Sequence, residues 1–176
     1  MRVGIDDELL FQPLQFAVLT VSDTRTEATD KSGDVLAERI QAAGHALAAR
    51  DIVKDDADAI VSQVKAWAFD PKIQIILTTG GTGLTGRDVT VQAVVPLFEK
   101  TLDGFSVLFH QMSLKTIGLA TLQSRACAGL INETFVFCLP GSTKAVTQSW
   151  DDIIRNALDS RYRPTSLVDL IPRLKE

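Results

Sequence analysis

Apolar and polar positions along the first half of the chain predict alternating strands and helices. Residues 16–22 and 73–79 are compact apolar runs typical of strands buried on both faces, and residues 46–53 predict a further strand between them. The intervening segments, 35–43 and 60–67, repeat apolar residues at helical spacing. The order strand, helix, strand, helix, strand predicts right-handed crossovers and a layered α/β sheet that is mostly parallel.

Polar residues mark the ends of the two predicted helices. We expect Ser32 to cap the first helix at its N-terminus and Gly44 to end it. Asp56 or Asp58 opens the second helix, and Pro71 closes that unit.

The second half of the chain is less regular. Its spacing predicts helices over 89–98, with Pro96 near the end or at a kink, and over 105–113, 125–132 and 143–160. Residues 135–139 predict a short strand. We expect one α/β domain over residues 15–163, between an irregular N-terminal extension (1–14) and a tail (164–176) that runs over the surface.

Composition and charge narrow the classes of function. The 176 residues are 45% hydrophobic and 23% charged, which is typical of a globular domain rather than a disordered chain. The net charge of −4 argues against partners bound by bulk attraction, namely nucleic acid and anionic membranes. An anionic ligand must therefore be held by local geometry. No apolar run is long enough to span a membrane, and no secretion signal is evident, so we expect a cytoplasmic protein.

The segment with the clearest functional signal follows the strand predicted over 73–79. It places four glycines, at positions 80, 81, 83 and 86, within seven residues. Glycines at the carboxyl end of a strand let backbone N–H groups approach a ligand, and such strand ends are where open α/β sheets bind ligands. A tight strand-to-helix turn is the structural alternative, but one glycine would satisfy it.

Two known phosphate-binding motifs match this loop only in part. Gly81, Gly83 and Gly86 have the spacing of the dinucleotide fingerprint, yet that motif requires a following strand that ends in an acidic residue, and residues 98–103 predict no strand. Gly81 and Gly86 also have Walker A spacing, but Arg87 and Asp88 stand where lysine and serine or threonine are needed. We therefore expect a different phosphate cradle, formed by the N–H groups of residues 80–83.

Acidic residues follow two of the predicted strands. Asp55 and Asp56 come after the strand over 46–53, and Asp88 ends the glycine loop. Loops after parallel strands open on the same edge of a sheet, and carboxylates beside phosphates suit Mg²⁺. The alternatives are helix capping for Asp56 and a favourable helix-dipole position for Asp88.

At these residues the sequence resembles the MoaB/Mog family of molybdenum cofactor biosynthesis, over nearly the whole chain. The matching pieces are Leu-Thr-Val-Ser-Asp-Thr at 19–24, Lys-Ser-Gly at 31–33, Thr-Thr-Gly-Gly-Thr-Gly-Leu at 78–84, Arg-Asp-Val-Thr at 87–90, Leu-Gln-Ser-Arg-Ala at 122–126 and Leu-Pro-Gly-Ser-Thr-Lys at 139–144.

The resemblance implies a three-layer α/β/α molybdopterin-binding fold that assembles as a homotrimer or a hexamer. It also implies molybdopterin adenylyltransferase activity, in which ATP with Mg²⁺ and molybdopterin give adenylyl-molybdopterin and pyrophosphate. The implied partners are ATP, molybdopterin and further copies of the chain, with no nucleic acid and no membrane. A molybdopterin-binding protein of the same pathway without catalytic activity is the alternative, and an interaction module is a third possibility.

The resemblance also assigns site residues. The two functional aspartates of the family fall on Asp55 and Asp88, as catalytic residues and ligands of Mg²⁺. The residues it implies for nucleotide binding are Thr79, Gly80, Gly81, Thr82, Gly83, Pro140, Gly141 and Ser142. Those implied for molybdopterin binding are Ser22, Ser113 and Ser124. Lys144 and Arg125 are either phosphate contacts or solvated surface residues.

Overall fold

A six-stranded sheet forms the centre of the computed structural model, which describes residues 3–176. Its strand order is β3-β2-β4-β7-β6-β5. The neighbours β3 (Ala46–Val53), β2 (Gln15–Val21), β4 (Ile75–Thr79) and β7 (Thr134–Leu139) are parallel. An antiparallel hairpin adds β6 (Cys127–Ile131), and β5 (Lys100–Thr101) pairs antiparallel with β6. The predicted, mostly parallel sheet is confirmed.

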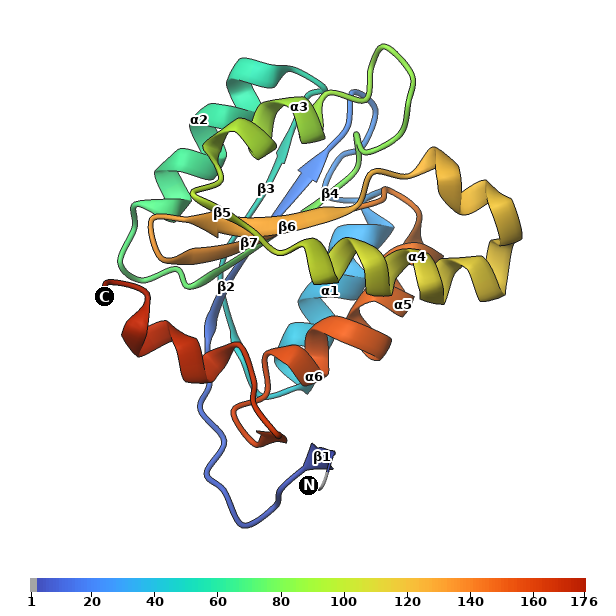
Figure 1. Cartoon of the computed structure of the whole chain (residues 1–176). Coiled ribbons are helices and arrows are strands. Elements are labelled where there is room, and N and C mark those ends of the chain that lie inside the picture. Colours follow the sequence, from blue (N-terminus) through green and yellow to red (C-terminus); the bar gives the residue numbers. More distant parts are fainter. Residues whose placement is uncertain (1–2) are drawn as a thin grey trace.

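Helices cover both faces of the sheet and give three layers (Figure 1). On one face α2 (Ala57–Ala68) and α3 (Thr90–Val94) enclose a core that includes Ile60, Val64 and Val94. On the other face α1 (Lys31–Ala42), α4 (Asp103–Ile117) and α5 (Thr143–Ser149) enclose a second core around Phe109 and Trp150. The strands between the two cores are apolar on both sides, which explains their continuous apolar runs.

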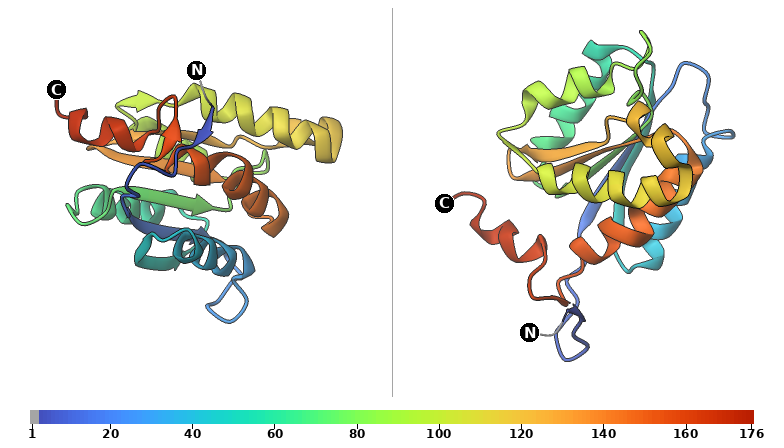
Figure 2. Two further views of the ribbon diagram at one scale, coloured as in Figure 1. Left: turned by 90° about the horizontal axis from the view of Figure 1, so that it is seen from below. Right: turned by 45° about the vertical axis from the view of Figure 1, so that its right-hand side comes forward.

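Short elements complete the chain. The turns η1 (Val95–Leu97), η2 (Gly118–Gln123) and η4 (Val168–Arg173) are 3₁₀ helices, and η3 (Trp150–Ile154) is a π-helical segment between α5 and α6 (Arg155–Ala157). Near the two termini, β1 (Gly4–Ile5) pairs antiparallel with β8 (Tyr162–Arg163). This small sheet and η4 lie at the end of the molecule away from the glycine loop (Figures 1 and 2).

Two element predictions were wrong, and a third was right only in part. Residues 125–132 form β6 rather than a helix, because this short apolar run pairs with β7 around a tight turn in which Asn132 and Glu133 have positive φ. Residues 98–103 contain the two-residue strand β5, which pairs at the antiparallel edge. The long helix predicted over 143–160 ends at Ala157 and is interrupted by η3.

Helix capping also differed from the prediction at one position. Asp30, not Ser32, caps α1, since its carboxylate accepts a bond from Gly33 N at 3.0 Å. Asp56 caps α2 as expected, and Gly44 follows α1 with a φ of +87°. The C-terminal tail is more buried than expected, because Val168 packs into the core that lies between the sheet and α1, α4 and α5. Within residues 3–176, no helix has both the length and the apolar character to cross a membrane.

Candidate functional site

The carboxyl ends of β2, β3, β4 and β7 bring four loops together at one edge of the sheet. Asp23 follows β2, Asp55 follows β3, residues 80–88 follow β4 and residues 140–142 follow β7. In Figure 1 the long loop between β4 and α3 projects at this end of the molecule. Segments more than 100 residues apart in the sequence therefore meet at the edge where open α/β sheets bind ligands.

Two glycines of the loop after β4 have backbone conformations that other residues rarely adopt. Gly80 has a φ of +104° and Gly81 a φ of +64°. A Cβ on Gly80 would collide with the carbonyl oxygen of Val21, and one on Gly81 would collide with the hydroxyl of Thr90. The glycines are therefore needed both for backbone conformation and for close approach to β2 and α3.

The glycine loop lies directly beside the turn that follows β7. Thr79 Oγ1 donates to the carbonyl oxygen of Pro140 at 2.9 Å, and Gly80 N donates to Leu139 O at 3.1 Å. A Cβ on Gly141 would lie 3.3 Å from Gly80 Cα. The resemblance assigns nucleotide binding to two segments that are far apart in the sequence, residues 79–83 and 140–142. The structure brings these two segments into contact.

Two serines form hydrogen bonds at the turn that follows β7. Ser142 caps α5, because its hydroxyl accepts a bond from Ala145 N at 3.2 Å. Ser32, which was expected to cap α1, is buried and donates to Gly141 O at 2.9 Å. Ser32 therefore holds the turn after β7 against the start of α1.

The N–H groups of the loop are only partly available to a ligand. The amide of Gly80 is used by Leu139 O, so the expected cradle over residues 80–83 does not include it. The amides of Gly81 and Thr82 donate to no acceptor within residues 3–176. These two N–H groups are the loop donors closest to β4 that remain for an anion.

Asp55 is paired with Asp23, an acidic residue that was not among the predicted site residues. Asp23 N donates to Asp55 Oδ2 at 3.0 Å, and Asp55 N donates to Asp23 Oδ1 at 3.2 Å. Burial raises the pKa of Asp55, and the neighbouring carboxylates of Asp23 and Asp88 add to this increase. The position of Asp23 at the end of the first predicted strand was the signal that could have identified it.

Asp88 is turned toward its own loop. Its Oδ2 accepts bonds from Thr85 N at 2.8 Å and from Thr85 Oγ1 at 2.6 Å. Partial burial acts to raise the pKa of Asp88, but the bonds from Thr85 and the amide of Gly83, with the charge of Arg125, outweigh it. The pKa of Asp88 therefore lies below its ordinary value, and the carboxylate is ionised at neutral pH.

The two predicted catalytic aspartates lie close enough to influence each other's charge. By themselves they do not form a complete metal-binding site. Asp23, which is bonded to Asp55, has its Oδ2 3.9 Å from Nη1 of Arg87, the residue before Asp88, and the charge of Asp88 adds to the raised pKa of Asp55. In the part of the chain that the structure describes, no three acidic, histidine or cysteine side chains group as a metal site. Oδ1 of each aspartate takes no part in the bonds to Asp23 and Thr85. This donor set fits Mg²⁺, which binds one or two protein carboxylates together with substrate oxygens.

The three serines assigned to molybdopterin are not gathered in one place. Ser22 lines a cavity of about 550 Å³ beside Asp23 and Lys54. Ser124 lines a more apolar cavity of about 590 Å³ over α4 and η2. Ser113 is buried within α4, with 5% of its surface exposed. The structure therefore leaves Ser22 and Ser124 accessible and encloses Ser113.

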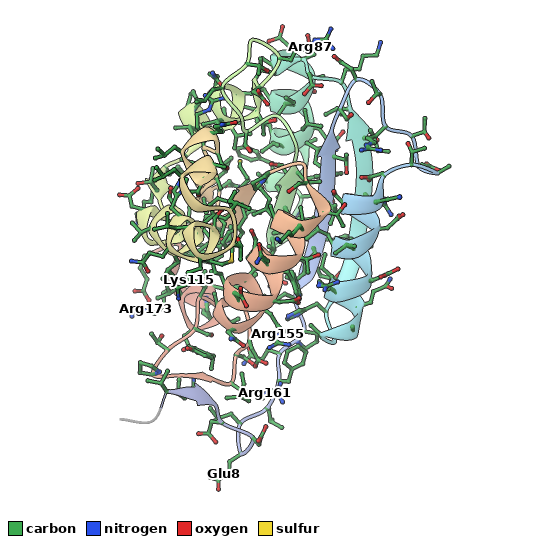
Figure 3. All side chains as sticks on the ribbon, turned by 90° about the vertical axis from the view of Figure 1, so that its right-hand side faces the viewer. Glu8, Arg87, Lys115, Arg155, Arg161 and Arg173 are labelled. Carbon is green, nitrogen blue, oxygen red and sulfur yellow. The ribbon has the colours of Figure 1, made fainter. Side chains whose placement is uncertain are left out.

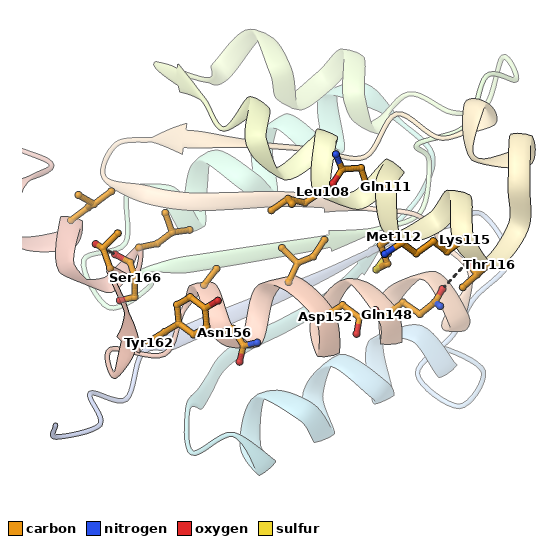
Figure 4. A pocket seen from close by; sticks show the side chains of 15 residues that line it. Leu108, Gln111, Met112, Lys115, Thr116, Gln148, Asp152, Asn156, Tyr162 and Ser166 are labelled. Atoms are coloured by element: carbon orange, nitrogen blue, oxygen red, sulfur yellow. Dashed lines mark hydrogen bonds between the residues drawn. The ribbon is translucent and has the colours of Figure 1, made fainter. Parts of the chain in front are cut away.

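A separate groove lies between α4, the helical run α5 to α6, and the C-terminal tail (Figure 4). Its volume is about 750 Å³, and its lining includes Met112, Lys115, Gln148 and Tyr162. None of the residues predicted for catalysis, nucleotide or molybdopterin lines it. We therefore take the sheet edge, rather than this groove, as the candidate functional site.

Fold and site together define an α/β protein with a glycine-rich loop and two aspartates at the carboxyl edge of its sheet. Residues 17–160 match the family model described as "Probable molybdopterin binding domain". The chain belongs to this molybdenum cofactor biosynthesis family, the MoaB/Mog family.

Individual relatives agree with this assignment. The chain is 46% identical over 154 residues to molybdenum cofactor biosynthesis protein B of Escherichia coli K12, covering 88% of this chain and 91% of that protein. It is 46% identical over 138 residues to the Bacillus subtilis protein of the same name, covering 78% and 81%.

A solved structure shows the same fold. It is the tungsten cofactor synthesizing protein MoaB from Pyrococcus furiosus, with a TM-score of 0.77 and 31% identity, covering 94% of this chain and 99% of that one. The protein described here is thus a MoaB-like protein of molybdenum cofactor biosynthesis.

Proposed function

We propose that this protein is a molybdopterin adenylyltransferase that uses ATP and Mg²⁺. The observation that carries the proposal is the convergence of Asp55, Asp88 and the glycine loop at one edge of the sheet. An oxygen of the terminal phosphate of molybdopterin forms a bond to the α-phosphorus of ATP. The bond from that phosphorus to the bridging oxygen breaks, and pyrophosphate leaves.

The residues of the chain supply positioning and charge. The free amides of Gly81 and Thr82 donate to phosphate oxygens, and the adjoining turn at residues 140–142 forms the second wall of the nucleotide site. Ser22 and Ser124, the assigned pterin contacts that remain accessible, line two different cavities. Such positioning provides most of the rate in phosphoryl-type transfers, because the protein has little covalent chemistry to perform.

Asp55 and Asp88 would hold the metal ion through carboxylate oxygens that take no part in the bonds to Asp23 and Thr85. When bound, Mg²⁺ supplies charge neutralisation for the triphosphate and its leaving group. The low pKa of Asp88 keeps this carboxylate ionised, which metal binding requires. The raised pKa of Asp55 reflects burial and repulsion that a divalent cation would relieve.

Release of pyrophosphate tests the proposal directly. Purified protein is mixed with molybdopterin, ATP and Mg²⁺, and pyrophosphate is measured with and without each component. We expect release that requires all three. A folded protein that binds molybdopterin and ATP but releases no pyrophosphate would contradict the enzymatic proposal.

Replacing Asp88 separates metal binding from folding. Asp88→Asn keeps the shape and the bonds to Thr85 but removes the charge, so we expect turnover to fall by at least about a hundredfold. The free energy of unfolding should change by less than about 1 kcal/mol. The matched control Asp58→Asn, on the exposed first turn of α2, should leave turnover unchanged. Full activity of Asp88→Asn would rule out the assigned metal role.

A specific observation supports the second candidate, a molybdopterin-binding protein without catalysis. The carboxylates of Asp55 and Asp88 already accept bonds from Asp23 and Thr85. If these bonds persist when nucleotide is present, the aspartates serve the loops rather than a metal. Molybdopterin binding that is insensitive to both Mg²⁺ and Asp88→Asn would favour this candidate.

A further inference from the structure

Arg125 makes an unusual set of bonds to the glycine loop from outside it. This residue lies between η2 and β6, about 40 positions after the loop. Its backbone N donates to Thr82 O at 2.9 Å and its Nε donates to Gly83 O at 2.8 Å. Its Nη2 donates to the carbonyl oxygen of Asp88, also at 2.8 Å. One arginine thus holds three carbonyl groups of a single loop.

A second residue completes this pattern from the other end of the loop. Thr90, at the start of α3, donates from Oγ1 to Gly80 O at 2.9 Å and from its backbone N to Gly81 O at 3.0 Å. Together, Thr90 and Arg125 provide a donor for every carbonyl oxygen from position 80 to position 83.

These bonds fix the direction of the loop amides. In a trans peptide the C=O and the following N–H point in opposite directions, and the one cis bond in the described chain is at Arg163–Pro164. Each bound carbonyl therefore sets where the next N–H points. The bonds from Thr90 orient the amides of Gly81 and Thr82, and those from Arg125 orient the amides of Gly83 and Leu84.

The chemistry of arginine suits this task better than direct contact with a ligand. Its planar fork donates in fixed directions, which is why Nε and Nη2 can hold two carbonyl groups at once. Nε–H and one N–H of Nη2 are committed to Gly83 O and Asp88 O, so these two donors hold the loop rather than a ligand. The positive charge still lies near the loop and contributes to the low pKa of Asp88.

We propose that Arg125 is a positioning residue that holds the glycine loop in the shape that binds a nucleotide polyphosphate. It acts through the peptide planes of residues 82–84 and through the backbone of Asp88. The inference rests on the proposed function for the identity of the ligand. The bonds of Arg125 to the loop replace the interpretation as a solvated surface residue and add a positioning role to that of phosphate contact.

The first experiment measures ATP binding in the presence of Mg²⁺ by calorimetry. We expect Arg125→Ala to weaken binding by about tenfold to a hundredfold, as for the loss of charge-assisted hydrogen bonds. Arg125→Lys should restore little, because lysine lacks the fork. Low, non-denaturing guanidinium chloride should recover much of the affinity of Arg125→Ala, whereas sodium or methylammonium chloride should not.

A matched control removes one positive charge from a residue that makes no contact with the glycine loop. Arg155 is exposed on α6 and lies far from Arg87 and the glycine loop (Figure 3). Arg155→Ala should bind ATP as the wild type does and should not respond to guanidinium. Unchanged affinity of Arg125→Ala, or full rescue by Arg125→Lys or by simple salts, would overturn the inference.

Hydrogen exchange tests the loop itself and needs no ligand. In Arg125→Ala, the peptide covering residues 80–90 should exchange faster than in the wild type and in Arg155→Ala, and guanidinium should slow it again. If the wild type binds no ATP, the proposed function fails and this measurement alone decides the inference. If exchange over residues 80–90 is unchanged, the positioning role is wrong whatever the protein binds.

Discussion

At the scale of single residues, the glycines of the loop differ in what they do. Gly80 and Gly81 have positive φ and lie where a Cβ would meet protein atoms. Gly86, three residues after Gly83, has nothing within 4 Å of the position of a Cβ. The density of glycines in the sequence predicted a ligand loop, but the density did not show which glycines the geometry requires.

This difference provides a paired experiment. Gly81→Ala should lower the free energy of unfolding by about 1–3 kcal/mol and weaken ATP binding at least about tenfold, because of the positive φ and the contact with Thr90. Gly86→Ala, in the same loop, should change the free energy of unfolding by less than about 0.5 kcal/mol and should bind ATP as tightly as the wild type. Denaturant unfolding and calorimetry measure both quantities. Equal behaviour of the two variants would contradict the assigned geometry.

At the scale of secondary-structure elements, the start of α1 depends on a buried carboxylate. Asp30 is 1% exposed and accepts bonds from Thr20 Oγ1 at 2.7 Å, Gly33 N at 3.0 Å and Arg50 Nη2 at 2.8 Å. These bonds join β2, β3 and α1 at the edge of the sheet that carries the site. Serine is a common N-cap residue, which favours Ser32 from the sequence alone. The partners of Asp30 come from distant strands, so no local pattern identifies it as the cap.

Removing this carboxylate should destabilise the fold. Asp30→Ala removes the helix cap and leaves Thr20 and part of Arg50 without a hydrogen-bond partner. We therefore expect the free energy of unfolding to fall by about 2–4 kcal/mol. Asp34→Ala is the control, since Asp34 is exposed and pairs with Arg50 at 2.8 Å. Asp34→Ala should lower the free energy of unfolding by less than about 1 kcal/mol. Similar losses in the two variants, measured by urea unfolding, would show that the buried network matters little.

At the scale of the whole molecule, the N-terminal segment is tied to the core through His45. Leu14 N donates to His45 Nδ1 at 3.1 Å, and the rings of Phe11 and Phe16 each lie 5.0 Å from the imidazole. Burial lowers the pKa of His45 to about 4, although the charge of Asp159 partly offsets this effect. The imidazole is therefore neutral in the folded protein at pH values where an unfolded chain already binds a proton.

This histidine predicts a pH dependence of stability. The unfolded chain takes up the proton first, near pH 6.5, so stability is complete above that pH and falls as the pH decreases toward about 4. The loss from His45 reaches about 3 kcal/mol at the lower limit. His45→Asn keeps an acceptor for Leu14 and should remove this slope, whereas His110→Asn should retain it. The same slope in wild type and His45→Asn, measured by urea unfolding between pH 7 and 5, would contradict the assignment.

The surface of the molecule bears on assembly. Exposed apolar side chains gather on α4 and η2, where Val107, Leu114, Leu119 and Leu122 are each at least half exposed. Patches of this kind are typical of contact surfaces. The homotrimer or hexamer implied by the family resemblance stays a prediction.

The sequence by itself determined the succession of strands and helices along the first half of the chain and the location of the glycine-rich loop. Those features depend on local apolar spacing and on glycine, which act within a few residues. It failed at β6, because a five-residue apolar run fits a strand and a helix equally well until a partner strand is present.

Only the tertiary structure decided how the site is built. The pairing of Asp23 with Asp55 and the bonds of Arg125 to the loop join residues that lie 32 and 42 positions apart in the sequence. Such contacts depend on where the chain folds back, which no local pattern specifies. The sequence predicted a ligand loop at residues 80–83, which stays a prediction, and the fold decided which amides of that loop remain without an acceptor.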